Sequence, residues 1–304
     1  TVFAQNSYPS KPVRIVVGFS AGGTTDVVAR IMAKELTQSL GQSFIIENRP
    51  GGGSNIATEV VKAADPDGYT LLFVAVTSTI NQTLYPKIKF DLNRDFEAVA
   101  LGAKVPNILV VHPSVPANNV KEFIEWARAN DDKIAYASSG SGTSIHMAGE
   151  MFKVRTGLKT QHVPYKGSAP SVVSLVAGET DFGFLTAVTI NAQLKAGNLR
   201  ALAVAHDSRL PAMPDVPTMN EAGLKGFMAD AWFMAAVPAG TPQPIVDRLY
   251  SEIAKILPQE DVKSKLDSVG VLPAGLSPKA SSTFLRNEIA KWNEVVKTAK
   301  ITLD

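Results

Sequence analysis

The stretch Val13-Arg-Ile-Val-Val-Gly-Phe-Ser-Ala-Gly-Gly-Thr-Thr-Asp26 decides how this chain folds. Residues 13–18 form an apolar run around Arg14, which is typical of a buried strand in a parallel sheet. A loop of small residues follows, and residues 27–40 have the spacing of an amphipathic helix, with Gly41 at the position where helices often end. The stretch therefore predicts a strand, a tight loop and a helix.

The chain up to residue 76 continues this pattern. Residues 44–47 are predicted as a second strand and residues 70–76 as a third. Between them, the glycine-rich segment 49–55 is predicted as a flexible loop and 56–64 as a short helix, closed by a turn at Asp65-Pro-Asp-Gly68. Alternating strands and helices indicate an α/β fold with a parallel sheet and right-handed crossovers.

The same order returns further along the chain, which predicts a second α/β unit. A stiff proline-rich connector, residues 211–217, follows it. The predicted strands of this part are 108–111, 134–137, 162–163, 181–185, 200–205 and 232–237, and the predicted helices are 120–129, 145–155, 168–176, 242–257, 259–268 and 279–299.

Two units predict two lobes, each with its own sheet, joined by a hinge. The last three helices have no sheet of their own, so the chain is expected to return to the first lobe. We place lobe 1 at residues 1–105 and 229–304, and lobe 2 at residues 106–228. The cleft between lobes is then the expected ligand site.

The composition excludes several classes of protein. With 304 residues, a net charge of +2, 19% charged and 45% hydrophobic residues, the chain is no supercharged nucleic-acid binder, disordered tail or coiled coil. The absence of cysteine excludes disulfides, thiolate metal sites and cysteine nucleophiles. Four histidines make a histidine-rich metal site unexpected, and we expect neither a metal nor a cofactor. Val2 and Ala4 fit a signal-peptidase site that cuts after Ala4, which indicates export.

The loop after the first predicted strand is the first candidate for ligand binding. Its small residues let peptide N–H groups face the cleft, and the helix that follows presents the positive end of its dipole, which favours an anion. The alternatives are a plain tight turn for the loop and a capping role for Asp26. The candidate residues are Phe19, Ser20, Ala21, Gly22, Gly23, Thr24, Thr25 and Asp26.

The second candidate loop also joins a predicted strand to a predicted helix. Its serine, threonine and glycine content is excessive for a simple turn, although a solvated loop is the alternative. The candidate residues are Ser139, Gly140, Ser141, Gly142, Thr143 and Ser144.

Further candidates lie at other strand ends, where open α/β sheets place ligands. We expect Thr77 and Ser78 to end the third strand, and Thr186 and Ala187 to occupy the matching position in lobe 2. Near a third helix start, Tyr165 and Gly167 are expected to reach the cleft. Lys166 is a candidate cation for the site, although a surface position is favoured for it.

The usual enzyme signatures are missing. The sequence has no G-x-S-x-G elbow, no phosphate-binding G-x-x-x-x-G-K-[ST] loop and no H-E-x-x-H motif. A binding protein is therefore favoured. Two alternatives stay open: a serine-based hydrolase that uses the serine-rich loop with a histidine, and a sensor that presents its ligand to a membrane kinase.

A set of short motifs, in order along nearly the whole chain, resembles the substrate-binding proteins of tripartite tricarboxylate transporters, the Bug or TctC family. One departure is Gly18, where the family commonly has proline. The motifs are Tyr8-Pro-Ser-Lys-Pro-Val-Arg-Ile-Val-Val17, Phe19 with Gly22-Gly23 and Asp26, Glu47-Asn-Arg-Pro-Gly51, Ser139-Gly-Ser-Gly-Thr143 with His146, His162-Val-Pro-Tyr-Lys-Gly167, Arg200-Ala-Leu-Ala-Val204, Pro214-Asp-Val-Pro-Thr218 and Val237-Pro-Ala-Gly-Thr-Pro242.

The resemblance implies a monomeric periplasmic protein of the two-lobed "Venus flytrap" type. It implies capture of a small carboxylate by the loops at 19–26 and 138–144, and delivery to a permease of one large and one small membrane subunit. A dicarboxylate, a tricarboxylate and an aromatic carboxylate all remain open as ligands, and an amino acid ranks lower because few acidic residues are at hand for its ammonium group.

Overall fold

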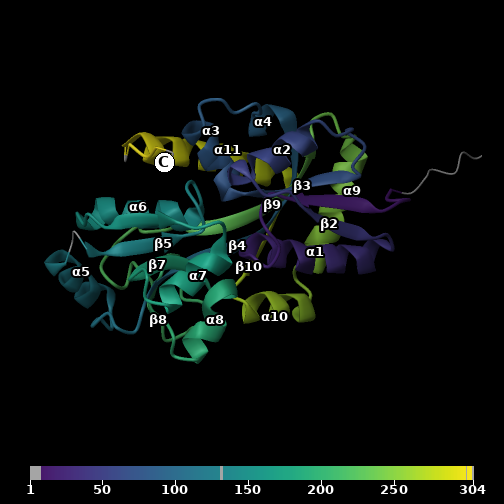
Figure 1. Cartoon of the computed structure of the whole chain (residues 1–304). Coiled ribbons are helices and arrows are strands. Elements are labelled where there is room, and N and C mark those ends of the chain that lie inside the picture. The colour runs from purple at the N-terminus through teal and green to yellow at the C-terminus, as the bar shows by residue number, and fades with distance from the viewer. Residues whose placement is uncertain (1–7, 131–132, 299, 303–304) are drawn as a thin grey trace, which may run out of the picture.

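The computed structural model describes residues 8–130, 133–298 and 300–302, so the expected cleavage site after Ala4 lies outside the described residues. It shows an α/β protein in which two groups of helices and strands lie side by side and two long strands, β4 and β9, run between them (Figure 1). The strands are β1 Val13–Val17, β2 Phe44–Asn48, β3 Thr70–Ala75, β4 Phe96–Val111, β5 Ala135–Ser138, β6 Gln161–Pro164, β7 Phe182–Thr186, β8 Arg200–Val204, β9 Asp230–Pro238 and β10 Leu272–Leu276.

Helices follow most strands, as the sequence predicts. A 3₁₀ turn, η1 (Gly52–Ser54), precedes α2. The α-helices are α1 Thr24–Leu40, α2 Asn55–Lys62, α3 Val76–Leu84, α4 Leu92–Asp95, α5 Val120–Ala129, α6 Ser144–Thr156, α7 Ser168–Val176, α8 Ala187–Lys195, α9 Gln243–Ile256, α10 Glu260–Ser268 and α11 Pro278–Thr298.

The sheet is mixed and continuous, with the strand order β2-β1-β3-β9-β4-β7-β5-β6, and β8 and β10 also pair with β4. The pairs of β1 with β2 and β3, and of β5 with β6 and β7, are parallel, as expected. Strand β4 is antiparallel to its partners β9 and β7. The sequence predicts two α/β sheets joined by a hinge, and in the structure the two groups of strands share β4 and so form one continuous mixed sheet.

Strand β4 explains this difference. The sequence predicts a strand only at 108–111, whereas the structure extends it over 16 residues. Nearly all of these residues are buried, so tertiary packing supports a strand along the whole segment. The division into lobes at residues 105 and 228 stays a prediction, and both boundaries fall close to where β4 and β9 pass between the two groups of elements.

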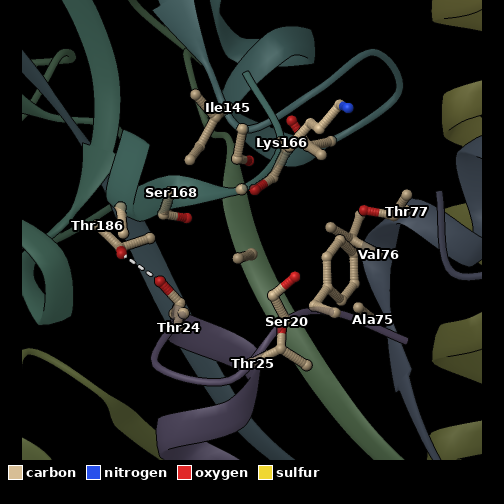
Figure 2. A pocket seen from close by; sticks show the side chains of 18 of the residues that line it. Ser20, Thr24, Thr25, Ala75, Val76, Thr77, Ile145, Lys166, Ser168 and Thr186 are labelled. Carbon is tan, nitrogen blue, oxygen red and sulfur yellow. Dashed lines mark hydrogen bonds between the residues drawn. The ribbon is translucent and has the colours of Figure 1, made fainter. Parts of the chain in front are cut away.

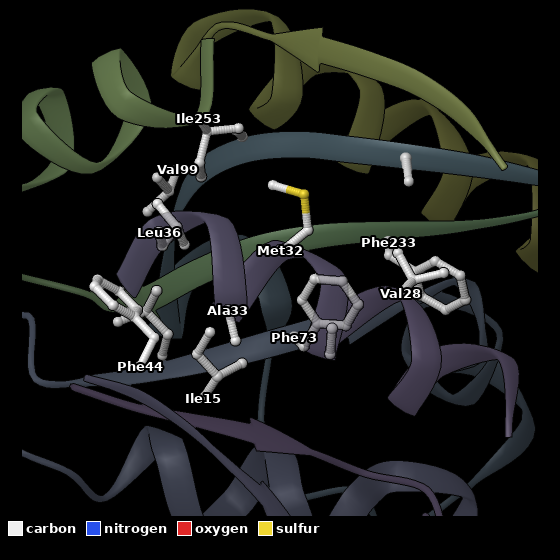
Figure 3. Packing of buried hydrophobic residues seen from close by; sticks show 14 of the residues in the cluster. Ile15, Val28, Met32, Ala33, Leu36, Phe44, Phe73, Val99, Phe233 and Ile253 are labelled. Carbon is white, nitrogen blue, oxygen red and sulfur yellow. The ribbon is translucent and has the colours of Figure 1, made fainter. Parts of the chain in front are cut away.

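Helix α1 packs against one face of the sheet portion that contains β1, β2 and β3. Val28, Met32 and Leu36 lie on the helix face toward the sheet and are at most 4% exposed (Figure 3). Beneath them, the rings of Phe73 on β3 and Phe233 on β9 stack with centroids 5.5 Å apart. This packing holds the start of α1 and the end of β3 in a fixed relation, and both border the site described below.

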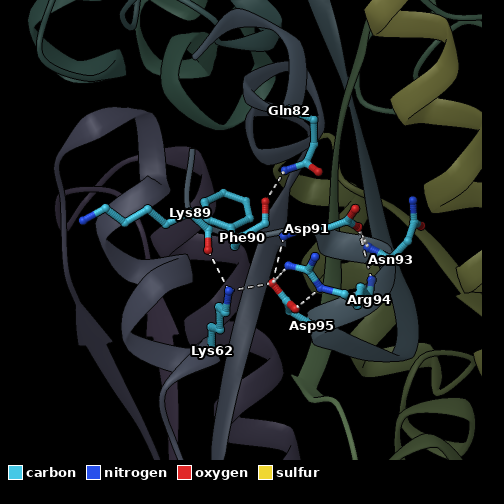
Figure 4. A network of polar contacts seen from close by, with 8 residues as sticks. All are labelled: Lys62, Gln82, Lys89, Phe90, Asp91, Asn93, Arg94 and Asp95. Carbon is cyan, nitrogen blue, oxygen red and sulfur yellow. Dashed lines mark hydrogen bonds and ion pairs between the residues drawn. The ribbon is translucent and has the colours of Figure 1, made fainter. Parts of the chain in front are cut away.

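A polar network ties α2 to the start of β4 (Figure 4). Lys62 donates to the Lys89 carbonyl at 2.6 Å and pairs with the Asp95 carboxylate at 2.9 Å. Arg94 donates two hydrogen bonds to the same carboxylate. These bonds, led by that to Arg94, lower the pKa of Asp95 well below its usual range. The carboxylate therefore stays ionised and holds α2 against the residues that precede β4.

The two chain segments that connect the sheet groups are bonded to each other. The backbone carbonyl of Asn107 on β4 accepts a hydrogen bond from the N–H of Ala205. The side-chain amide of Asn107 donates a hydrogen bond to the carbonyl of Ala229 at 2.6 Å. Next to them, the buried His206 Nδ1 lies 2.9 Å from the Asp230 carboxylate, and its Nε2 lies 3.1 Å from Asp207. Burial alone lowers the pKa of His206, but the hydrogen bond to Asp230 and the charges of both aspartates outweigh it and raise the pKa overall.

This histidine predicts a pH dependence of stability. Because its pKa is raised in the folded state, its contribution is fully present below about pH 6.5, the ordinary histidine pKa, and is lost as pH rises through the raised value. Urea unfolding at pH 6, 7 and 8 should show the free energy of unfolding falling over this range. The decrease should be smaller in His206→Gln, and equal slopes in both proteins would contradict the assignment. Lys104 also faces His206 and opposes its charging, so Lys104→Met should extend the stable range upward.

Candidate functional site

The site lies where several helices begin. Each of β1, β3, β5, β6 and β7 leads at its carboxyl end into a helix, and these are α1, α3, α6, α7 and α8. The first residues of α1, α3, α6 and α7, and the N-cap residue of α8, line one pocket. Unpaired N–H groups and the positive ends of helix dipoles therefore converge on a single space.

We call this space the Thr24 pocket. It has a volume of about 190 Å³ and is lined from both sheet groups. Thr24 at the start of α1 and Thr186 at the end of β7 lie on opposite sides, and their hydroxyl oxygens are 2.7 Å apart (Figure 2). This hydrogen bond joins two parts of the chain that are 162 residues apart and closes one end of the pocket.

Part of the pocket wall is apolar. Ala75 and Val76 line it where β3 passes directly into α3, and Ala231 and Phe233 line it from β9. Ile145 contributes from the first turn of α6. The pocket thus combines hydroxyls and helix starts with a hydrocarbon surface, which suits an acid that has an apolar body.

The first loop is held in shape by Asp26, which does not itself line the pocket. Its buried carboxylate accepts the N–H of Gly22 at 3.0 Å and the side-chain amide of Asn48 at 2.9 Å. It also pairs with Arg30 at 2.8 Å, and Asn48 donates in addition to the carbonyl of Phe19. Burial raises the pKa of Asp26, but the bonds to Arg30, Gly22 and Asn48 outweigh it, so the pKa is lowered overall.

The second loop is held by a pair of histidines. The N–H of Gly142 donates to His146 Nδ1 at 3.1 Å, and the rings of His146 and His162 stack with centroids 4.1 Å apart. His162 Nε2 lies 2.6 Å from the Ser138 hydroxyl, which also accepts the N–H of Gly140 at 3.1 Å. Burial and the neighbouring His146 lower the pKa of His162 to about 3. A neutral His162 can accept from Ser138, and this fixes the base of the loop.

The structure brings most of the predicted site residues together. Whether they contact a ligand stays a prediction, but their position at one pocket is now clear. The predicted residues that line the Thr24 pocket are Phe19, Ser20, Ala21, Gly23, Thr24, Thr25, Thr77, Ser139, Thr143, Ser144, Gly167 and Thr186.

A second pocket of about 490 Å³ adjoins the first, and we call it the Ser54 pocket. Gly140 and Ser141 line this second pocket rather than the first. The residues common to the two pockets are Phe19, Ser20, Ser139, Thr143, Lys166 and Gly167.

Other predicted residues lie outside both linings. Gly22 and Asp26 support the first loop from behind, as described above. Gly142 faces α3, where an added Cβ would approach Leu84 to 2.9 Å. Tyr165 donates its hydroxyl to Ser174. Ala187 is buried against the loop at Gly270, and Ser78 is buried within α3.

The place of Thr77 and Ser78 differs from the expectation. They lie in the first turn of α3, whereas the sequence predicts them at the end of a strand. The run Val76-Thr-Ser-Thr79 has strong strand propensity, but all of these residues are buried in helical conformation. Burial against neighbouring elements outweighs the local preference here.

Gly18, the departure from the family's proline, has a physical explanation. A Cβ at this position would lie 1.9 Å from the Ser54 hydroxyl oxygen. Gly18 and a serine at 54 are therefore compatible, whereas any larger residue at 18 would displace Ser54.

Sequence reasoning missed some lining residues and ranked another low. Lys166, for which the sequence favours a surface position over a role as the site's cation, is exposed and also lines both pockets. Ser168, Ala169 and Pro170 line the Thr24 pocket from the start of α7, a position that the strand-to-helix pattern already marks. Among the described residues that line the two pockets there is no aspartate or glutamate, and Lys166 provides the positive charge.

The described residues include no cluster of three or more histidine, cysteine, aspartate or glutamate side chains able to hold a metal ion. None of the helices within them is long and apolar enough to cross a bilayer.

Comparison with solved structures shows close likeness over the whole chain. A structure described as a periplasmic transporter has a TM-score of 0.93 at 36% identity, with 98% of this chain and 100% of the other covered. Rpa4515 of R. palustris with adipate gives the same values. MatC from Rhodopseudomonas palustris with bound malate has a TM-score of 0.87 at 33% identity, covering 95% of this chain and 100% of that one. These neighbours are binding proteins with the same α/β fold.

Sequence relatives agree with this likeness. A protein encoded in the tcbD-tcbE intergenic region of Pseudomonas sp. strain P51 is 35% identical over 96% of this chain and 87% of its own length. Protein BugT of Bordetella pertussis is 33% identical over 96% of this chain and 90% of its own length. Residues 28–301 match the family described as the tripartite tricarboxylate transporter family receptor, TctC. The chain therefore belongs to the TctC family of transporter receptors.

Proposed function

We propose that this protein is a periplasmic receptor that binds a small carboxylate in the Thr24 pocket and delivers it to a tripartite tricarboxylate-type transporter. The observation that carries the proposal is the convergence of the starts of α1, α3, α6 and α7 and the N-cap of α8 on one pocket. Peptide N–H groups and hydroxyls at helix starts bind anions without a counter-charge.

The energetics suit a carrier. A hydrogen bond to a charged group contributes about 1.5–3 kcal/mol. Three or four such bonds give about 5–12 kcal/mol before the costs of association and of closing the lobes are subtracted, so we expect an affinity that is micromolar, about −8 kcal/mol, or weaker. The ligand shifts the protein toward the closed form only through its higher affinity for that form. The Thr24–Thr186 hydrogen bond is one contact that exists only when the two sides meet.

The relatives support the class of ligand and partner. Rpa4515 is described with adipate and MatC with malate, and both are dicarboxylates. The TctC family implies a tripartite transporter as partner. We infer that this protein acts as a monomer in the periplasm, after removal of a signal peptide, with one large and one small permease subunit. A sensor role would use the same pocket and would add a membrane kinase as partner.

Binding is favoured over hydrolysis. In the serine-rich loop, Ser138 contacts His162, but Ser138 is fully buried and lines neither pocket. Its oxygen also accepts the Gly140 N–H, so the pair supports the loop. Ser114 contacts His112, and this pair also lies outside both linings. Nothing in this arrangement presents a nucleophile to a bound ester.

The proposal is tested by thermal unfolding in the presence of small acids and of their amides. We expect at least one acid from a set that includes malate, adipate, citrate and benzoate to raise the melting temperature, because a ligand that binds only the native state stabilises it. The matching amides should give no shift, since they lack the charge that the helix starts stabilise. An amide that binds as well as its acid would contradict carboxylate recognition.

A further inference from the structure

The Ser54 pocket is a feature that the proposed function leaves unused. The Thr24 pocket, at about 190 Å³, is smaller than the range of roughly 300–1,000 Å³ usual for ligand sites. The adjoining Ser54 pocket has about 490 Å³, and Lys166 lies in the wall of both. A ligand that begins in the first pocket therefore has space to continue into the second.

The walls of the Ser54 pocket are suited to a negative group. The segment from Gly51 to Ser54 has positive φ at every residue and leads into the N-terminus of α2, whose dipole is positive at this end. Ser54 is 1% exposed, and its hydroxyl oxygen has no hydrogen-bond partner among the described residues. Tyr85 and Ser141 also line the pocket and contribute hydroxyls.

This shape is held by specific contacts. Asn81 on α3 donates to the carbonyl of Gly53 at 2.7 Å and to the side chain of Asn55 at 2.8 Å. A Cβ at Gly53 would lie 3.2 Å from the Tyr85 hydroxyl, so the tyrosine oxygen sits close beside this backbone. The glycine-rich segment, which the sequence predicts as a flexible loop, is therefore fixed onto α3.

Lys166 provides the charge at the boundary. In Figure 2 its side chain runs away from the Thr24–Thr186 pair, which closes the opposite end of the Thr24 pocket. Among the described residues no carboxylate forms an ion pair with Lys166, and none lines the Ser54 pocket. Its ammonium group is thus available to a ligand that passes from one pocket to the other.

We propose that the Ser54 pocket is a second subsite for a carboxylate of the ligand. It takes the far carboxylate of a linear dicarboxylate whose near carboxylate lies in the Thr24 pocket. This inference rests on the proposed function, because it needs the first pocket to hold the near carboxylate. Lys166, at the boundary between the pockets, serves the far carboxylate together with Ser54, Tyr85 and the start of α2.

The test uses calorimetric titration with linear dicarboxylates of four to eight carbons, each paired with the monocarboxylate of the same length. Against the wild-type protein, the best dicarboxylate should bind at least tenfold more tightly than its monocarboxylate. Ser141→Asp places a negative charge in the Ser54 pocket, and it should weaken the dicarboxylate at least tenfold and the monocarboxylate less than threefold. Ser141→Asn has the same shape without the charge, so it measures the loss of the hydroxyl alone, and the dicarboxylate should bind at least threefold more weakly to Ser141→Asp than to Ser141→Asn.

A second variant guards against a folding defect in the first. Lys166 is exposed, so Lys166→Met should fold normally, and it should reduce the preference for the dicarboxylate. Equal affinity for the two acids of a pair, or equal losses for both in Ser141→Asp, would overturn the second subsite and leave the carboxylate receptor intact. If no acid binds, the receptor proposal fails, and the subsite fails with it.

Discussion

Replacing Asp26 by alanine is expected to weaken ligand binding at least tenfold, although Asp26 does not line the pocket. Its carboxylate is 2% exposed and holds the first loop through Gly22, Asn48 and Arg30. Without it, the loop residues Phe19 to Thr25 lose the contacts that fix their N–H groups toward the pocket. The free energy of unfolding should fall by about 2 kcal/mol, the usual size for a hydrogen-bonded charged group.

Calorimetric titration with the best acid, together with urea unfolding, measures the two effects of Asp26→Ala. Asp26→Asn keeps the shape and one accepting oxygen, so it should lose less of both quantities. Because the pKa of Asp26 is lowered in the folded protein, its contribution is present above about pH 4 and is lost as pH falls further. An affinity that is unchanged in Asp26→Ala would show that the loop needs no support from this carboxylate.

A methyl group at Gly142 is expected to produce the second large effect, by holding the two sides of the cleft apart. Gly142 has φ +78°, and an added Cβ would lie 2.9 Å from Leu84 and 3.1 Å from Asn81, both on α3. Gly142→Ala therefore adds a clash between the second loop and the opposite side, as well as backbone strain of about 1–2 kcal/mol. We expect at least a tenfold loss of affinity for the best acid.

Gly157 provides the matched control for this variant. It ends α6 with φ +75°, and an added Cβ there would meet no atom within 4 Å. Gly157→Ala should therefore show the same backbone strain in urea unfolding but an unchanged affinity. Equal affinities in the two variants would show that the contact between Gly142 and α3 does not limit closure.

The local sequence was sufficient for the parts of the site that lie on one continuous segment. The strand at 13–17, the loop after it and helix α1 follow from an apolar run, small residues and an amphipathic repeat. Ser139 to Ser144 were found in the same way, because serine and glycine crowd between a strand and a helix. Such signals depend on neighbours in the chain, so they can be read before the chain is folded.

Features that combine distant segments could not be predicted. The sequence favours a surface position for Lys166, because the two pockets that it borders are formed by segments that are far apart in the chain. Phe233 joins the wall of the Thr24 pocket only because β9 pairs with β3 and β4. The fit between Gly18 and Ser54 likewise depends on two segments that meet only in the folded chain.

The sequence by itself determined that this is an α/β protein with loops rich in small and hydroxyl residues at strand ends, since hydrophobic period and turn chemistry are local properties. Only the tertiary structure decided that both sheets share β4, that helix starts from both sides meet at one pocket, and that a second pocket adjoins it. The physical reason is that burial and side-to-side contact between distant segments are not encoded at any single position. They arise when the whole chain packs.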